Sequence, residues 1–371
     1  MHSIRRAFVK TVGFAGTAKN TGKTTTALHV LQAGEAAGLR LALTSIGYDG
    51  ENRDNVTGLP KPRYALQSGI LVATGLTCLR SGTAVVRTIE ETPIYTIFGQ
   101  VVVGEVTRPG TVLLAGPNRS SDLQQVFDIL ARLGCSLALV DGALNRLAPM
   151  TCVDGLALST GAAFDQRIPH VVEHAGALLR LLRMPVIRGE APVRDGLLVE
   201  FRDRTSSTLG YGSLIGKKLL EALLRALNAP VEKVYIPGAC DPNLLKLVID
   251  QKAELLRGAL MLFYSPLHLV ASGDPLLWGE IFHLLEEAEI HLGSLQTSQV
   301  FFMTVNPFYP RYLDRSGTYE AAYVDKQELL AAARRCISEI PVLDVFQPPF
   351  PNLISLINHF AELPDAARPL C

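Results

Sequence analysis

A turn rich in glycine and small polar residues near the N-terminus is the feature that most constrains how this chain folds. The turn follows a short apolar run at residues 9–15, and a helix-like segment at residues 23–37 comes after it, closed by Gly38. Residues 39–46 form the next apolar run. This order predicts a βαβ unit, and therefore a parallel sheet with right-handed crossovers. The turn and the first helical residues are Gly16, Thr17, Ala18, Lys19, Asn20, Thr21, Gly22, Lys23, Thr24 and Thr25.

The residue types in this turn suit the binding of a nucleoside triphosphate. Glycines and small residues let successive backbone N–H groups turn inward around phosphate oxygens, and the following helix adds its positive N-terminal end. Lys23 is placed to reach the β- and γ-phosphates, and the Thr24 hydroxyl is placed to ligate Mg²⁺. The usual pattern is G-x4-GK[ST], but here five residues separate Gly16 from Gly22. The position between a strand and a helix nevertheless favours a phosphate-binding loop over a surface turn that binds nothing.

An aspartate follows an apolar run at the sheet edge where such a loop lies. Asp141 directly follows residues 137–140. A carboxylate at the carboxyl end of a parallel strand binds Mg²⁺ directly or through water, or polarises the attacking nucleophile. The alternative for Asp141 is a turn with Gly142. The sequence therefore predicts Thr24 and Asp141 as metal ligands, and Lys23 and Asp141 as catalytic residues.

The form Gly-Thr-x4-Gly-Lys-Thr resembles that of dethiobiotin synthetase and its relatives among the deviant P-loop NTPases, a group that includes the MobB-type proteins. The resemblance covers roughly residues 8–190 and implies a parallel-sheet P-loop domain that binds ATP with Mg²⁺. In that group the second strand ends in an acidic or otherwise polar residue near Mg²⁺, and Asp49 fits that place. The resemblance therefore implies that Asp49 is a metal ligand and a catalytic residue, although a solvated loop is the alternative. It also implies that the turn at residues 160–163 helps to hold the base, although a plain strand-to-helix turn is the alternative. No NKxD motif, which reads guanine, occurs in the chain, and this absence favours adenine.

Two further points of the resemblance bear on assembly and reaction. Proteins of this group often act as dimers in which a lysine reaches across, so a homodimer is implied, and Lys19 lies one residue from the signature position of that lysine. The Lys-Pro pair that follows the second strand of dethiobiotin synthetase is absent, because Thr44, Ser45 and Ile46 stand there. A fainter likeness, through the turn and Asp141-Gly142-Ala143, is to reactivating ATPases associated with lysine 5,6-aminomutase.

The rest of the chain predicts a second, smaller α/β domain. Glycine, proline and charged residues at 189–196 indicate the boundary, so we expect a P-loop nucleotide-binding domain at residues 1–190 and a C-terminal α/β domain at residues 196–371. Expected strands of the C-terminal domain are 197–201, 234–236, 259–263, 300–305 and 342–345. Its expected helices are 214–227, 243–251, 276–287 and 326–337. In the first domain we expect a helix at residues 168–182, a hairpin of 101–106 with 111–115, and a helix over 122–133 capped by Ser120 or Ser121.

Composition narrows the class of partner. Lys plus Arg and Asp plus Glu balance at 35 each, so the chain has no general attraction for nucleic acid or anionic membranes, and we expect neither as a partner. No window is apolar for the roughly 18 to 20 residues that a membrane span needs. The six cysteines are scattered without a CxxC pair, which is typical of reduced core residues in a cytoplasmic protein.

Several isolated residues have a structural and a functional interpretation. His170 and His174 have the i, i+4 spacing of metal ligands, but a surface or partly buried pair is the commoner meaning. Asp241 before Pro242 predicts a helix N-cap. Asn306 and Asp344 stand where a second α/β domain would bind a ligand. Trp278 is assigned to the core.

Three kinds of function remain open for a nucleotide-binding chain of this type. The first, which we favour, is an ATP hydrolase that couples hydrolysis to action on a partner protein bound through the C-terminal domain; reactivation of a cobalamin-dependent aminomutase is the example that the resemblance offers. The second is an ATP-dependent ligase or kinase that acts on a small molecule. The third is a regulator that senses the nucleotide without appreciable turnover.

Overall fold

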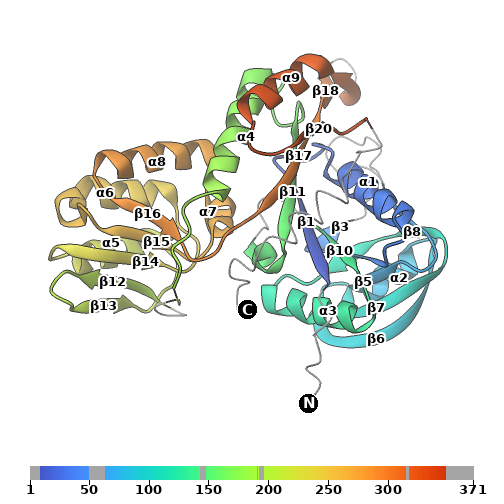
Figure 1. Ribbon diagram of the computed structural model, residues 1–371, viewed down its shortest axis with the longest axis horizontal. Coiled ribbons are helices and arrows are strands. Elements are labelled where there is room, and N and C mark those ends of the chain that lie inside the picture. The colour runs from blue at the N-terminus through green and yellow to red at the C-terminus, as the bar shows by residue number, and fades with distance from the viewer. Residues whose placement is uncertain are drawn as a thin grey trace. The chain divides into compact units, whose positions relative to one another are not determined.

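The chain divides into two compact units (Figure 1). The computed structural model describes residues 9–49, 63–142, 148–189, 191, 196–314 and 317–347. Unit 1 consists of Met1–Val172 and Val300–Cys371, and unit 2 consists of Glu173–Gln299. Unit 2 is therefore an insertion between two parts of unit 1.

Within the described residues, unit 1 is built on a nine-stranded sheet that is mostly parallel. All neighbouring strands from β20 to β5 run parallel, and β7 and β6 add an antiparallel edge. The α/β class and the parallel sheet expected from the alternating pattern are confirmed. In spatial order the strands are β20 (Val342–Asp344), β17 (Val300–Asn306), β11 (Gly155–Gly161), β1 (Lys10–Gly16), β10 (Leu137–Asp141), β2 (Leu41–Ser45), β5 (Leu71–Gly75), β7 (Gly99–Arg108) and β6 (Val85–Thr96).

Four described helices of unit 1 begin and end close to the positions that the sequence predicts, and two short ones have no counterpart in the prediction. The described helices are α1 (Lys23–Ala36), α2 (Leu76–Ser81), α3 (Ser120–Arg132), α4 (Ile168–Leu182), which runs on into unit 2, α9 (Lys326–Cys336) and the short η2 (Ala148–Cys152). α1 buries Thr26, Ala27, Val30 and Leu31. It ends before Gly38, whose φ of 70° is the left-handed conformation that closes helices. The expected Ser120 or Ser121 cap is wrong, because α3 already begins at Ser120 and Arg119 is its N-cap.

Short antiparallel pairs beside the large sheet replace the expected hairpin of residues 101–106 with 111–115. The first run lies inside β7 and pairs with β5 and β6, and the second is divided between β8 (Gly110–Val112) and β9 (Leu114–Gly116). β8 pairs with β4 (Tyr64–Leu66), and β9 pairs with β3 (Gly47–Asp49). The hairpin prediction is wrong because a short apolar run specifies a strand without specifying its partner. A further described pair joins β18 (Phe308–Leu313) to β19 (Thr318–Tyr323).

Unit 2 is a smaller α/β unit, whose elements are labelled in Figure 1. Its described sheet has five strands, of which β14, β15 and β16 are parallel and β12 is antiparallel to both of its neighbours. The strands in spatial order are β13 (Ser206–Leu209), β12 (Leu197–Phe201), β14 (Val231–Ile236), β15 (Leu260–Phe263) and β16 (His291–Ser294). The helices are α5 (Lys217–Ala226), α6 (Pro242–Leu256), α7 (Pro266–Ser272) and α8 (Pro275–Glu287).

The division into units differs from the expected domains at residues 1–190 and 196–371. β17 and β20 lie in the second half of the sequence, yet they extend the large sheet of unit 1 beside β11. Every residue of β17 is buried, so this strand needs cover on both faces. Unit 2 begins at Glu173, within α4, so the composition at residues 189–196 does not coincide with a change of unit. The return of the chain to the first sheet has no compositional signal.

Local predictions in unit 2 hold. The Asp241 carboxylate accepts the Asn243 N–H at 2.9 Å and caps α6, with Pro242 in the first turn. Trp278 is fully buried and its indole N–H donates to the Leu269 carbonyl at 3.0 Å.

Among the described cysteines Cys78, Cys135 and Cys240 are buried, but Cys336 is exposed, so the assignment of all cysteines to the core is wrong for Cys336.

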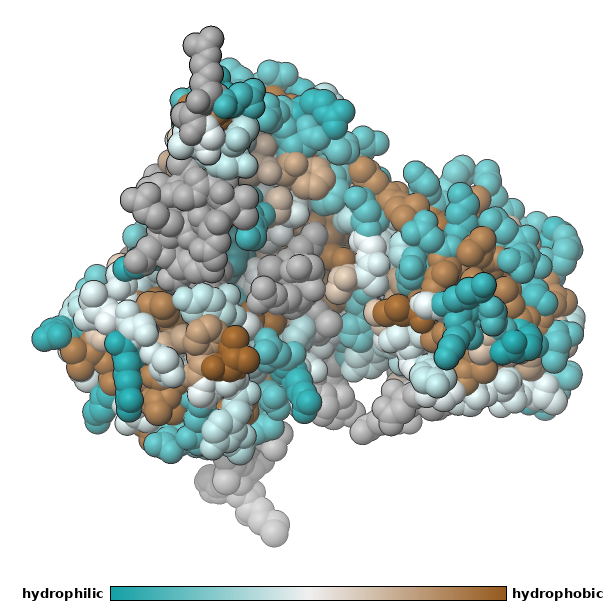
Figure 2. Space-filling model, turned by 180° about the vertical axis from the view of Figure 1, so that it is seen from behind, coloured by the Kyte–Doolittle hydropathy of each residue, from teal (hydrophilic) through white to brown (hydrophobic). Residues whose placement is uncertain are grey.

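The surface is mixed in character. Figure 2 shows hydrophobic and hydrophilic residues interspersed over the face that it presents. The most exposed large apolar side chains in the described part are Ile97, Tyr95 and Tyr211. None of the described helices combines the length and the apolar character that crossing a membrane requires.

Candidate functional site

The glycine-rich turn joins the central strand β1 to α1. β1 ends at Gly16, and Gly22 is the N-cap of α1 with a φ of 93°. Asn20 is also left-handed, with a φ of 65°, and asparagine is one of the few residues other than glycine that tolerate this conformation. Lys23 is therefore the first residue of a helix that starts at the carboxyl edge of the sheet. We call residues 16–23 the first glycine loop.

Contacts from distant strands hold the first glycine loop. Thr17 donates its N–H to the Ser159 carbonyl at 2.9 Å and its hydroxyl to Thr160 Oγ1 at 3.0 Å. The side-chain amide of Asn306 donates to the Asn20 carbonyl at 3.0 Å. Since Thr160 belongs to β11 and Asn306 ends β17, the two strands that flank the insertion of unit 2 both support this loop.

Glycine is required at both ends of the loop. A Cβ on Gly16 would lie 2.5 Å from Thr21 Oγ1, and a Cβ on Gly22 would lie 2.9 Å from Val345 Cγ2. Thr21 itself is buried and donates its hydroxyl to the Ala18 carbonyl at 2.9 Å. The backbone is thus folded too tightly for side chains at these two positions.

The N-terminus of α1 has no side-chain cap within the described structure. In contrast, aspartate side chains cap α6, α8 and α9. The first N–H groups of an uncapped helix remain available to an external acceptor, and the helix dipole favours an anion there. Thr24 and Thr25 lie in this first turn and are half-buried.

A buried ion pair lies at the start of α1. Asp141 is the last residue of β10, between Phe14 of β1 and Ser45 of β2, and its side chain has no exposed surface. Lys23 Nζ forms an ion pair with Asp141 Oδ1, and the Tyr64 hydroxyl donates to Asp141 Oδ2 at 2.7 Å. Removing one partner of a buried ion pair costs about 3–5 kcal/mol of stability. This pair therefore holds the Lys23 and Asp141 side chains firmly together.

A cluster of hydroxyl groups lies beneath the loop. Thr304 Oγ1 is 2.8 Å from Thr26 Oγ1 and 2.9 Å from Ser159 Oγ, and all three residues are buried. These hydrogen bonds join α1, β11 and β17. Polar groups that satisfy one another in the interior fix the register of the elements that carry them.

The other predicted site residues have different outcomes. Asp49 ends β3, where it pairs with Leu114, and its side chain lies outside the described residues. The predicted ligand role of Asn306 and Asp344 in a second domain is wrong, because both belong to unit 1. Asn306 supports the first glycine loop, and Asp344 Oδ1 accepts the Phe346 N–H at 2.8 Å.

The two histidines of α4 lie in different surroundings. His170 Nδ1 is 2.7 Å from Asp165 Oδ2, whereas His174 is buried. Arg167 beside Asp165 holds the pKa of that carboxyl well below its usual range. No group of three or more His, Cys, Asp or Glu side chains suited to a metal occurs in the described part of the chain.

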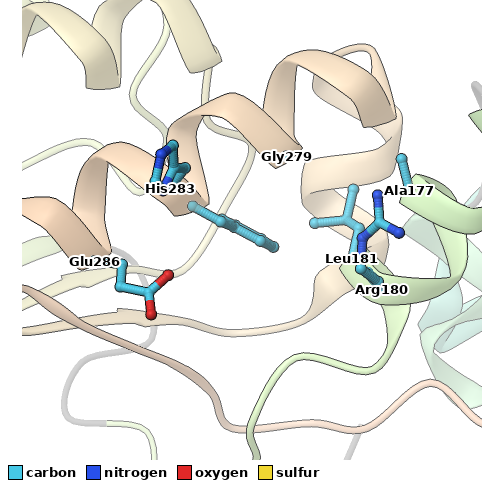
Figure 3. Close-up of a pocket in the computed structure, with 7 residues that line it drawn as sticks. Ala177, Arg180, Leu181, Gly279, His283 and Glu286 are labelled. Carbon is cyan, nitrogen blue, oxygen red and sulfur yellow. The ribbon is translucent and has the colours of Figure 1, made fainter.

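A shallow hollow of about 220 Å³ lies in unit 2 between α4 and α8 (Figure 3). Figure 3 shows Arg180 of α4 and Glu286 of α8 at opposite ends of it. His283, which also lines the hollow, pairs with Glu287 on its own helix at 3.4 Å. None of the predicted site residues lines this hollow.

Sequence reasoning missed Tyr64 and assigned Asn306 to the wrong site. Tyr64 follows a stretch without clear periodicity, and its contact with Asp141 spans 77 positions. Asn306 directly follows an apolar run, which is the same signal that identified Asp141. That signal places a residue at the edge of a sheet but does not say which sheet.

The candidate site is therefore the first glycine loop with Lys23, Asp141 and Tyr64. Compared with known proteins, the chain matches no family model and no curated sequence.

Proposed function

We propose that unit 1 is a Mg²⁺-dependent P-loop ATPase domain. The observation that carries this proposal is the pairing of Lys23, on the uncapped first turn of α1, with the buried carboxylate of Asp141 at the end of the neighbouring parallel strand. Next to a tightly folded glycine loop, the Lys23 ammonium is suited to exchange the Asp141 carboxylate for another anion. The γ-phosphate is the anion that the loop, the helix N-terminus and the lysine would share.

The residues at this site fit a magnesium ion together with a triphosphate. Mg²⁺ prefers oxygen ligands and is commonly held by one or two carboxylates together with substrate phosphates, so a three-residue cage is not needed. Asp141 supplies the carboxylate and Thr24 the hydroxyl, with Asp49 as the second acidic candidate. When bound, the ion neutralises charge on the β- and γ-phosphates.

Each residue then has a defined task. Backbone N–H groups of the first glycine loop and of the α1 terminus bind phosphate oxygens, while Lys23 moves from Asp141 to the β- and γ-phosphates. Asp141 orients the attacking water or the metal's water shell. Hydrolysis forms a bond from the water oxygen to the γ-phosphorus and breaks the bond from that phosphorus to the β–γ bridging oxygen, which leaves ADP and inorganic phosphate.

The chain connectivity supports coupling of hydrolysis to a partner. β17 begins at Val300, directly after the last residue of unit 2, and its final residue Asn306 contacts the first glycine loop. A partner bound to unit 2 would thus act on a strand that supports the loop. A cobalamin-dependent aminomutase is the partner class that the sequence resemblance offers. We therefore prefer an ATPase coupled to a partner protein over the two alternatives, a small-molecule ligase or kinase and a nucleotide sensor.

One experiment separates these functions. ATP binding and phosphate release are measured for the purified chain alone, with small carboxylic acids, and with a cobalamin-dependent aminomutase. We expect Mg²⁺-dependent hydrolysis that the protein partner stimulates. A phosphorylated small product would instead identify a ligase or kinase, binding without turnover would identify a sensor, and the absence of ATP binding would overturn the proposal altogether.

A further inference from the structure

The two oxygens of the Asp141 carboxylate are held by different elements. Oδ1 lies in the ion pair with Lys23 of α1, and Oδ2 accepts the hydrogen bond of Tyr64 from β4. The aspartate side chain has no exposed surface, so water cannot take the place of a lost partner. Losing either contact therefore leaves a buried charge without compensation, which is costly. The geometry of the carboxylate therefore depends on both contacts.

The two partners differ in how easily they move. Lys23 has a long flexible side chain that is 17% exposed, so its ammonium is able to reach a ligand. Tyr64 is 2% exposed, pairs in β4 with Val112 of β8, and belongs to the apolar core that contains Leu43 and Leu139. A phenol packed in this way keeps its hydroxyl in place while the lysine changes partner.

We infer that Tyr64 is a positioning residue for Asp141, and this rests on the proposed function. When Lys23 turns to the phosphates, Tyr64 keeps its hydrogen bond to Oδ2, so the carboxylate does not rotate and Oδ1 is presented to the metal. Outer partners of this kind orient metal-binding carboxylates, and their removal typically costs about 10- to 100-fold in metal affinity or activity. Tyr64 acts through Asp141 and does not itself touch the nucleotide.

The substitution Tyr64→Phe tests this role because it removes the hydroxyl and keeps the ring in the core. Mn²⁺ affinity is measured by electron paramagnetic resonance in the complex with a non-hydrolysable ATP analogue, and analogue affinity is measured separately without metal. We expect Mn²⁺ affinity to fall about 10-fold or more, within the range for such outer partners. Metal-free analogue affinity is expected to stay within about threefold, because Tyr64 does not contact the phosphates.

A matched control and a second variant separate positioning from general damage. Tyr235→Phe removes a hydroxyl from another buried tyrosine, in unit 2, and should change neither affinity. In an Asp141→Asn background, Tyr64→Phe should have no further effect on Mn²⁺ affinity, because the residue through which it acts is already altered. Thermal unfolding of each variant checks that the fold is retained.

The outcomes distinguish this inference from the proposed function. If the unaltered protein binds no ATP analogue, the proposed function is overturned, and the role of Tyr64 with it. If the unaltered protein binds the analogue and Mn²⁺ but Tyr64→Phe leaves Mn²⁺ affinity unchanged, only the positioning role is overturned. The same conclusion follows if Tyr64→Phe weakens Mn²⁺ binding equally in the Asp141→Asn background.

Discussion

Two glycine loops with the same spacing lie in the two units. Residues 16–23 and residues 210–217 both read Gly-x5-Gly-Lys, and each connects a strand to a helix. Gly22 and Gly216 are both helix N-caps with positive φ, 93° and 83°, and neither α1 nor α5 has a side-chain cap in the described structure. By local sequence the two loops are close equivalents, but their backbones differ, because Gly22 has a ψ of 9° and Gly216 a ψ of 155°.

Their surroundings differ. β1 lies between two parallel neighbours in the large sheet, whereas β13 is an edge strand that pairs with β12 alone among the described strands. Lys23 is 17% exposed and pairs with a buried aspartate, but Lys217 is 87% exposed and lies 4.0 Å from Glu221 on its own helix. The spacing therefore predicts a turn, and the neighbouring strands decide whether a buried carboxylate lies beside its lysine.

The backbone groups of the second loop are also used differently. Leu214 donates its N–H to the Ala239 carbonyl at 2.8 Å, and Gly238 donates to the Gly212 carbonyl at 2.6 Å. The second loop is thus bonded to residues 238–239, which follow β14, whereas the first loop is bonded through Thr17 to β11. What sets the first loop apart is the buried carboxylate of Asp141 beside its lysine. We therefore propose ATP binding for the first loop only.

The largest expected difference between the loops is the effect of removing the lysine. Lys23→Ala should weaken ATP binding about 100-fold, because charge-assisted hydrogen bonds to phosphate are worth about 1.5–3 kcal/mol each. Lys217→Ala is the matched control and should leave ATP affinity unchanged. The ATP affinity of both variants is measured by calorimetric titration. If the two variants bind ATP equally well, the proposed difference between the loops is wrong.

The substitution Asp141→Asn tests the role of the buried carboxylate beside Lys23, which has no buried counterpart beside Lys217. We expect Mg²⁺-dependent hydrolysis to fall about 10- to 100-fold, a range typical for loss of a metal-orienting group. Metal-free ATP affinity should not fall, and we expect it to rise, since Lys23 is released from its ion pair. Phosphate release and metal-free binding are measured on the same preparation, and normal turnover would remove Asp141 from the site.

Asn306→Ala removes support that reaches the first loop from β17. The loss of one hydrogen bond of about 1 kcal/mol should weaken ATP binding about fivefold. Asn243→Ala, at an exposed amide on α6, is the control and should have no effect on ATP affinity. If both variants bind ATP like the unaltered protein, β17 does not support the loop in the way proposed.

The smallest expected difference concerns the two N-cap glycines. Gly22 lies in the left-handed region, where an alanine costs about 1–2 kcal/mol. Gly216, with a ψ of 155°, lies in a region that is essentially restricted to glycine, so alanine is strained there as well. Gly22→Ala also forces a Cβ against Val345, whereas a Cβ at Gly216 meets nothing within 4 Å. Because the larger backbone strain at Gly216 offsets the added contact at Gly22, we expect both variants to unfold at a lower temperature, with midpoints within about 2–4 °C of each other. A fall in the midpoint for Gly22→Ala alone would show that the second loop relaxes without cost.

Most elements were predictable from the sequence because their signals are local. Helical spacing and the terminal glycine defined α1, the Asp-Pro pair defined the start of α6, and continuous apolar runs defined β10 and β17. The hairpin prediction failed, and so did the domain boundary. Both depend on which strands pair, and short apolar runs carry no information about that choice.

The sequence by itself determined that a strand, a tight glycine loop and a helix beginning at Lys23 follow one another, and that Asp141 ends a buried strand. Periodicity, chain reversal and backbone freedom at glycine are properties of a few adjacent residues. Only the tertiary structure decided that Lys23 meets Asp141, that Tyr64 holds the other oxygen, and that Asn306 contacts a loop 286 positions away. Such contacts follow from strand order in the sheet, which is set by the packing of the whole unit.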